Sequence, residues 1–343
     1  MDYTAFIKDL EEFMPTLGSI FDKCYNSLLA GEPLPGLDEI WNMILNTVKE
    51  NMADSLQVFF SMFIIGLLSS VLTHCGNIFK NRQISDLAFY FTYLYAVILL
   101  LQVFYVMLET AVAAVESIIS FTQILIPAFY ITVAMCYASI TAGAFYQLNL
   151  LLLYAVEIIF PEVIIPLISC FVFIAVISGS AEEDRFHEIL SLIKKSIGVI
   201  IKVCMSTVAG IGVMKSLIHP VADHVNYNLF QKTIAAIPGI GDVTDSVSKM
   251  LLGSAVLIKN SMGIVALLLM ILLVSAPLTK LFLLSFLLKA AGAGVGLFGE
   301  QRLTKCIARV SEGGFMLLKA TLAVIMIFFI LIALVTAVAG RGY

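Results

Sequence analysis

Residues 315–338 read FMLLKATLAVIMIFFILIALVTAV, and Lys319 is the one charged side chain in this run. The hydrocarbon core of a bilayer takes a helix of about 20 largely apolar residues. The run therefore predicts a membrane-spanning helix. The composition of the whole chain agrees, because 60% of its 343 residues are hydrophobic and 13% are charged, against about half and about a quarter in soluble domains. These fractions exclude an ordinary soluble enzyme.

Segments of similar length and apolarity recur along the rest of the chain. The regular ones lie at 55–75, 88–108, 196–216 and 253–277. The stretch 143–180 is long enough for two spans divided near Pro161, and less regular segments lie at 117–140 and 281–298. Since a helix satisfies its own backbone polar groups in lipid, we predict an all-α, polytopic membrane protein with seven to nine segments in the lipid bilayer.

The first 54 residues differ from this membrane domain, which we place at residues 55–343. They hold ten acidic residues and three basic ones, a net charge of −7, whereas the rest of the chain holds 14 acidic and 17 basic residues. Apolar residues recur every three or four positions from Tyr3 to Leu28, which predicts an amphipathic helix. Its apolar stripe either packs on the membrane domain or docks a partner helix. We expect no secretory signal here, because acidic residues interrupt the start.

Short basic segments predict the orientation, because loops rich in Lys and Arg stay in the cytoplasm. They lie around Lys80 and Arg82, at 181–195 and at 299–314. All three are expected inside, which places the acidic head, Glu109 and Glu116 outside. The formal net charge of −4 argues against nucleic acid as a partner.

A weak internal repeat relates two parts of the chain. A shift of 111 residues aligns Ile126-Pro127 with Ile237-Pro238, and Asn149 with Asn260. We therefore predict parallel repeat halves at 82–180 and 185–298, followed by the final span. Paired, proline-interrupted segments are where membrane transport proteins place broken helices and substrate paths.

The stretch 233–263 is the candidate site, because its proline, glycines and charges are unsuited to contact with lipid. It is either a re-entrant helix lining a hydrated path or an extracytoplasmic amphipathic loop helix. A Glu157–Lys259 pair across the repeat halves would serve structure or relay protons. The candidate residues are Pro238, Gly239, Gly241, Asp242, Gly253, Lys259 and Asn260, with Pro127, Asn149 and Glu157 as their repeat counterparts.

Motifs of nucleotide or metal chemistry are missing from the sequence. It has neither a P-loop nor an HExxH motif, and its six cysteines are scattered. We therefore expect no catalytic residues, no cofactor and no metal. Residues 292–296 read GAGVG, and glycines in an apolar segment favour close packing between helices over nucleotide binding.

Several blocks together resemble one family. They are IPGIGD at 237–242, LGSA at 252–255, KNSMG at 259–263, PLTK at 277–280 and GEQRL at 299–303. This pattern is similar to the stage III sporulation protein AE family, over roughly residues 55–340. Members of that family often begin with a signal peptide, which we do not expect in this chain.

The resemblance implies a polytopic subunit of a complex in the mother-cell membrane around the forespore. That complex is thought to form a channel or secretion-like conduit, with an ATPase encoded in the same operon. The implied partners are that ATPase, other stage III sporulation membrane proteins and further copies of the chain. The family has no catalytic residues to carry over. The alternative is a self-sufficient secondary transporter with a substrate site near Glu157, Asp242 and Lys259.

Overall fold

The computed structural model describes residues 24–27, 37–78, 82–136, 139–180, 186–235, 241–297 and 301–338. These residues are helical almost throughout, and none of them forms a strand, so the predicted all-α class is confirmed. The helices are α3 (Leu37–Ile78), α4 (Arg82–Cys136), α5 (Ser139–Ile158), α6 (Ile165–Ser180), α7 (His187–Ala235), α8 (Gly241–Gly296) and α9 (Gln301–Val338). The π-helical turn η1 (Ile159–Ile164) joins α5 to α6 in one continuous rod.

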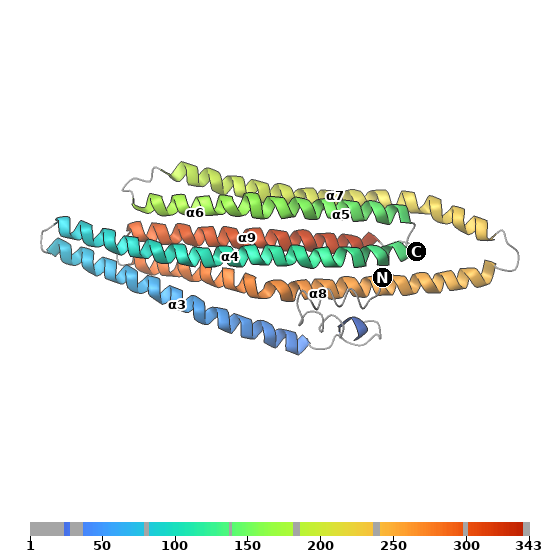
Figure 1. Ribbon diagram of the computed structural model, residues 1–343, viewed down its shortest axis with the longest axis horizontal. Coiled ribbons are helices and arrows are strands. Elements are labelled where there is room, and N and C mark those ends of the chain that lie inside the picture. The colour runs from blue at the N-terminus through green and yellow to red at the C-terminus, as the bar shows by residue number, and fades with distance from the viewer. Residues whose placement is uncertain are drawn as a thin grey trace.

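The rods form an antiparallel bundle of three layers (Figure 1). One outer layer holds α7 and the α5–η1–α6 rod, the middle layer holds α4 and α9, and the other outer layer holds α3 and α8. Helix α9 packs against α4, α6, α7 and α8. In agreement, 67% of its most apolar window is buried, against 29–39% in the other candidate spans. The apolar run at 315–338 therefore lies at the centre of the bundle.

Within the part of the chain that the structure describes, five helical stretches are long and apolar enough to cross a membrane, by length and composition. They are Asn51–Val71, Tyr90–Pro127, Gln147–Gly179, Gly263–Gly296 and Gln301–Ile332. In three places, two segments that were predicted separately lie in one continuous helical rod. These rods are α4, α5–η1–α6 and α8. The further predicted segment, 196–216, lies in α7, whose side chains are described only as far as Ile211.

Three prolines of the predicted segments lie within helical rods and do not reverse the chain. Pro127 lies inside α4 and Pro277 inside α8. Pro161 lies in η1, where the wider π-helical turn accommodates a residue without a backbone N–H. Around Pro277, the Ser275 hydroxyl donates to the Leu272 carbonyl at 2.8 Å. Asn51 of α3 donates to the Ala276 carbonyl at 3.3 Å. The missing N–H of Pro277 leaves the Leu273 carbonyl without its helical donor, and both of these bonds fall on carbonyls close to it.

The helix ends beside the three basic segments lie together. Ile78, Ser180 and Gly296 end their rods at the left end of the bundle in Figure 1, where Arg82, His187 and Gln301 begin the next ones. The common end agrees with the prediction that the three segments share one side of a membrane. Its assignment to the cytoplasm stays a prediction. We call this end the basic end.

The described part of the acidic head packs on the bundle. Cys24 and Tyr25 are 1% and 6% exposed and belong to the same apolar core as the long helices. Burial raises the pKa of the Cys24 thiol. At these two residues, the predicted amphipathic segment packs on the membrane domain, which is the first of the two alternatives given for its apolar stripe. The predicted boundary at residue 54 falls inside α3 and stays a prediction.

Candidate functional site

Two adjacent polar residues of α9 reach two different helices. The Ser311 hydroxyl donates to the Ser285 carbonyl of α8 at 2.8 Å, and both serines are fully buried. The Glu312 carboxylate forms an ion pair with Lys194 of α7. These side chains tie the central helix to both outer layers.

Two glycines follow directly and allow α9 to approach its neighbouring helices closely. A Cβ atom at Gly313 would lie 2.2 Å from a methyl group of Val172 on α6. A Cβ atom at Gly314 would lie 2.4 Å from the Ser285 hydroxyl and 2.7 Å from the Met107 sulfur on α4. Only a hydrogen atom fits at such distances, as at the small-residue contacts of membrane helices. We call residues 311–314 the α9 junction, since they touch α4, α6, α7 and α8.

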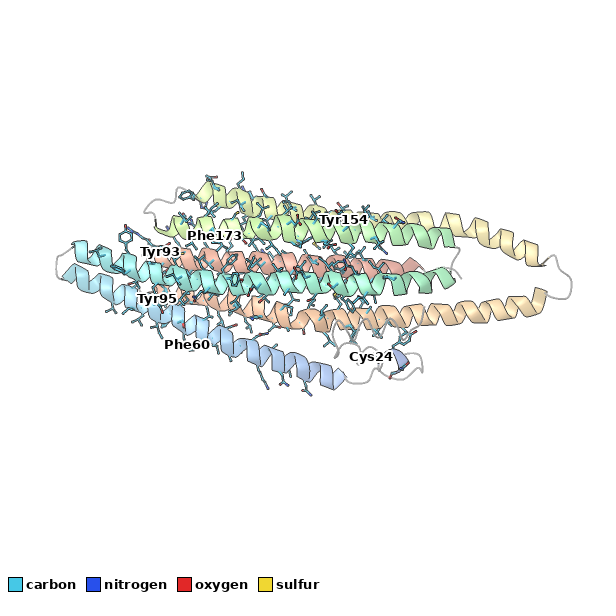
Figure 2. All side chains as sticks on the ribbon, viewed as in Figure 1. Cys24, Phe60, Tyr93, Tyr95, Tyr154 and Phe173 are labelled. Atoms are coloured by element: carbon cyan, nitrogen blue, oxygen red, sulfur yellow. The ribbon has the colours of Figure 1, made fainter. Side chains whose placement is uncertain are left out.

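A second polar cluster joins α4, α6 and α9 nearer the basic end. The Tyr93 hydroxyl donates to the Val176 carbonyl at 2.7 Å and lies 3.8 Å from the Cys306 sulfur. Arg309 donates to the Ser178 hydroxyl at 3.0 Å. Tyr93 is 5% exposed and Cys306 is fully buried. Figure 2 shows Tyr93 toward the basic end of α4. We call this set the Tyr93 cluster.

Both sets fix helices relative to one another, and their geometry provides anchors for a rigid bundle. Each buried hydrogen bond between membrane helices stabilises the fold by about 0.6 kcal/mol on average. Among the described residues, no group of three or more His, Cys, Asp or Glu side chains is placed to hold a metal ion.

The Lys194–Glu312 pair can be tested by exchanging its charges. Reversing one charge, as in Lys194→Glu, places two carboxylates together and is expected to lower thermal stability in detergent. The double variant Lys194→Glu/Glu312→Lys restores an attractive pair and should recover most of the loss. The side chains are 54% and 36% exposed, so the effect is expected to stay within about 1 kcal/mol. Equal loss in the single and double variants would contradict a direct pair.

The sequence-predicted site residues occupy separate parts of the bundle. Pro127 is half-buried inside α4, whereas Asn149 is buried and Glu157 exposed on α5. The other predicted residues fall into two groups. On the first half of α8, with side chains outside the described set, lie Gly241, Asp242, Gly253, Lys259 and Asn260. Between α7 and α8, outside the described residues, lie Pro238 and Gly239. The re-entrant segment, the repeat and the Glu157–Lys259 pair stay predictions.

The backbone of α7 and α8 shows how far these two helices extend. Helix α7 continues to Ala235, and α8 is helical without a break from Gly241 to Gly296. The two helices extend past the ends of α4, α5 and α9, at the end of the bundle opposite the basic end (Figure 1). Gly241 therefore begins a long helix that projects beyond the rest of the bundle.

The residues at 292–296 confirm the packing interpretation of their glycines. A Cβ atom at Gly292 would lie 3.2 Å from Ile307 on α9, and one at Gly294 would lie 2.9 Å from Phe63 on α3. Sequence reasoning missed the α9 junction and the Tyr93 cluster. The paired glycines 313 and 314, at the start of the most apolar run, were the one local signal of a close contact.

The fold and these contacts define a helical membrane protein built around a central, tightly packed helix. A family model described as stage III sporulation protein AE matches residues 20–339. A relative, "Stage III sporulation protein AE" of Bacillus subtilis (strain 168), is 22% identical over 283 residues, which are 82% of this chain and 70% of the relative. The chain belongs to the stage III sporulation protein AE family, as the resemblance implied. No solved structure matches it.

Proposed function

We propose that the chain is a non-enzymatic membrane subunit of a channel or secretion-like complex between the mother cell and the forespore. The observation that carries this proposal is the family match, which extends over residues 20–339 and so includes every long helix of the bundle. The bundle supports it because its described polar clusters serve helix packing. The proposed partners are other stage III sporulation membrane proteins, the operon-encoded ATPase and further copies of the chain.

The proposed location is the mother-cell membrane around the forespore, with the basic end in the cytoplasm and the acidic head outside. The positive-inside rule favours this orientation, since the helix ends that flank all three basic segments share one end of the bundle. In this arrangement the projecting ends of α7 and α8 lie on the same side as the head. That side would face the forespore, where an intercellular conduit has to be completed.

Deletion of the gene in its native host tests the role in sporulation. Vegetative growth should be unchanged, while the yield of heat-resistant spores should fall by orders of magnitude. A wild-type copy should restore the yield. So should a copy carrying Gly210→Val, a matched control, because a Cβ atom at Gly210 would have no neighbouring atom within 4 Å. Normal spore yield in the deletion strain would contradict the proposal.

The rival hypothesis is a self-sufficient secondary transporter with a substrate near Glu157, Asp242 and Lys259. Glu157 lies on α5 in one outer layer, and the other two lie on α8 in the opposite outer layer, with α4 and α9 between the layers. This separation disfavours one shared site. The rival requires ion-coupled uptake by the purified chain in liposomes and its loss in Lys259→Ala. We expect no such uptake.

A further inference from the structure

The outward-facing side chains of α4 change character along the helix. From Leu87 to Val106 the exposed side chains are apolar or aromatic, apart from Gln102. They are Leu87, Tyr90, Phe91, Leu94, Tyr95, Ile98, Tyr105 and Val106. Beyond this point, as far as Pro127, the exposed residues are Glu109, Ala113, Glu116 and Gln123. The surface that α4 presents thus changes from apolar to polar between Val106 and Glu109.

Helix α3, which packs antiparallel to α4, changes in the same way. Its exposed residues between Phe60 and Val71 are all large and apolar. Toward the head the exposed set includes Asn42, Asn46, Lys49 and Gln57, together with Leu45, Met52 and Ala53. The apolar part of each helix is the part nearest the basic end.

The α5–η1–α6 rod shows no such change. Large apolar side chains are exposed before Glu157 and Glu162 as well as after them, namely Leu150, Leu151 and Tyr154 before and Val163, Phe173 and Ile177 after. The change is therefore a property of the α3–α4 face. Tyr105 on α4 is 57% exposed and lies four residues before Glu109, at the kind of position where membrane proteins concentrate tyrosine.

The apolar parts fit within one bilayer. At 1.5 Å per residue, Leu87 to Val106 covers about 29 Å, and Phe60 to Val71, the last described side chain of α3, covers about 17 Å. A hydrocarbon core is about 30 Å thick, whereas the whole of α4 is about 80 Å long. A single bilayer therefore accounts for these apolar surfaces and leaves the remainder of each rod uncovered.

We propose that on the α3–α4 face lipid covers only the part nearest the basic end, with its far boundary at Gln57 and Glu109. The outward faces of α3 and α4 beyond this boundary are in contact with water. Glu109, Glu116 and Gln123 follow at intervals of seven residues on one face of α4, and a carboxylate facing hydrocarbon is strongly disfavoured. No described exposed residue between Glu109 and Pro127 is a large apolar one, so lipid would gain no contact there.

This placement holds whether or not the chain is a channel subunit, and it extends the proposed function by assigning a water-exposed helical surface outside the membrane. Together with the packed head and the projecting ends of α7 and α8, the far part of the α3–α4 face becomes available to extracytoplasmic proteins. The candidate span in α4 is thereby reduced to the part near the basic end.

Cysteine labelling of the full-length chain in native membranes tests the boundary. In a background without the native cysteines, Ala113→Cys and Gln123→Cys are compared with Leu94→Cys and Ile98→Cys, all at exposed positions of α4. The probe is a membrane-impermeant maleimide carrying a polyethylene glycol chain too bulky to enter a pore. We expect labelling at 113 and 123 to be at least an order of magnitude faster than at 94 and 98, since only the latter face hydrocarbon.

Labelling after denaturation in SDS shows that each thiol is present and reactive. Equal protection of all four positions would overturn the proposal, because it would extend the lipid past Glu109. Reaction of positions 113 and 123 with a small charged thiosulfonate, but not with the bulky maleimide, would also overturn it. That result would place this face of α4 along a narrow aqueous path inside the membrane.

Discussion

Replacing Gly314 by valine is expected to prevent the bundle from reaching its native packing. The first added carbon would already lie 2.4 Å from the Ser285 hydroxyl and 2.7 Å from the Met107 sulfur. Both neighbours are fully buried on helices that pack directly on α9, so either these side chains or α9 itself must shift within a packed interior. Overpacking of a close-packed interior costs about 1–3 kcal/mol, and a loss of this size lowers the steady-state amount of a protein several-fold.

The measurements are the amount of full-length protein in the membrane and the midpoint of unfolding in mixed SDS micelles. Gly210→Val is the matched control, because its Cβ atom would meet nothing within 4 Å. We expect the control to resemble the wild type. If Gly314→Val accumulates and unfolds like the control, α9 does not approach its neighbours as closely as the structure shows.

Replacing Tyr93 by alanine is expected to cause a larger loss of stability through the opposite mechanism. The ring is 5% exposed, so its removal leaves a cavity between α4, α6 and α9, and removal of a buried aromatic ring costs about 3–5 kcal/mol. The hydrogen bond to the Val176 carbonyl is lost as well. Tyr93→Phe, which keeps the ring and removes only this bond, should lose about 0.6 kcal/mol.

Tyr95 provides the control, because it lies two residues away on the same helix and is 58% exposed (Figure 2). Tyr95→Ala should unfold near the wild-type midpoint. The expected order of stability is therefore Tyr95→Ala above or equal to Tyr93→Phe, with Tyr93→Ala far below both. Similar midpoints for Tyr93→Ala and Tyr95→Ala would show that the Tyr93 cluster does not stabilise the bundle.

Composition and charge are sufficient to predict the class of fold and the common end of the basic segments. Both depend on one-dimensional patterns, namely apolar length and the positions of Lys and Arg. The division into segments is less successful, because Pro161 and Pro277 suggest ends of spans and Pro127 suggests an interrupted one. In the bundle they lie within continuous helical rods. Packing against neighbouring helices and a π-helical turn at Pro161 accommodate these residues, which a single segment cannot reveal.

The sequence does not predict the contacts of the α9 junction, for a different reason. Ser311 and Ser285 are 26 residues apart, and Lys194 and Glu312 are 118 residues apart. Their pairing depends on which helices become neighbours, and neither member of a pair carries a signal for the other. The GAGVG segment is easier to interpret, because glycines in an apolar helix already indicate a close contact.

Purification of the tagged full-length chain from sporulating cells of its native host tests the proposed function most directly. We predict that other stage III sporulation membrane proteins co-purify with it after mild detergent extraction, and that they are absent from a parallel purification of an unrelated tagged membrane protein. Recovery of the chain without any of them, together with ion-coupled uptake by the purified chain alone in liposomes, would contradict a role as a complex subunit.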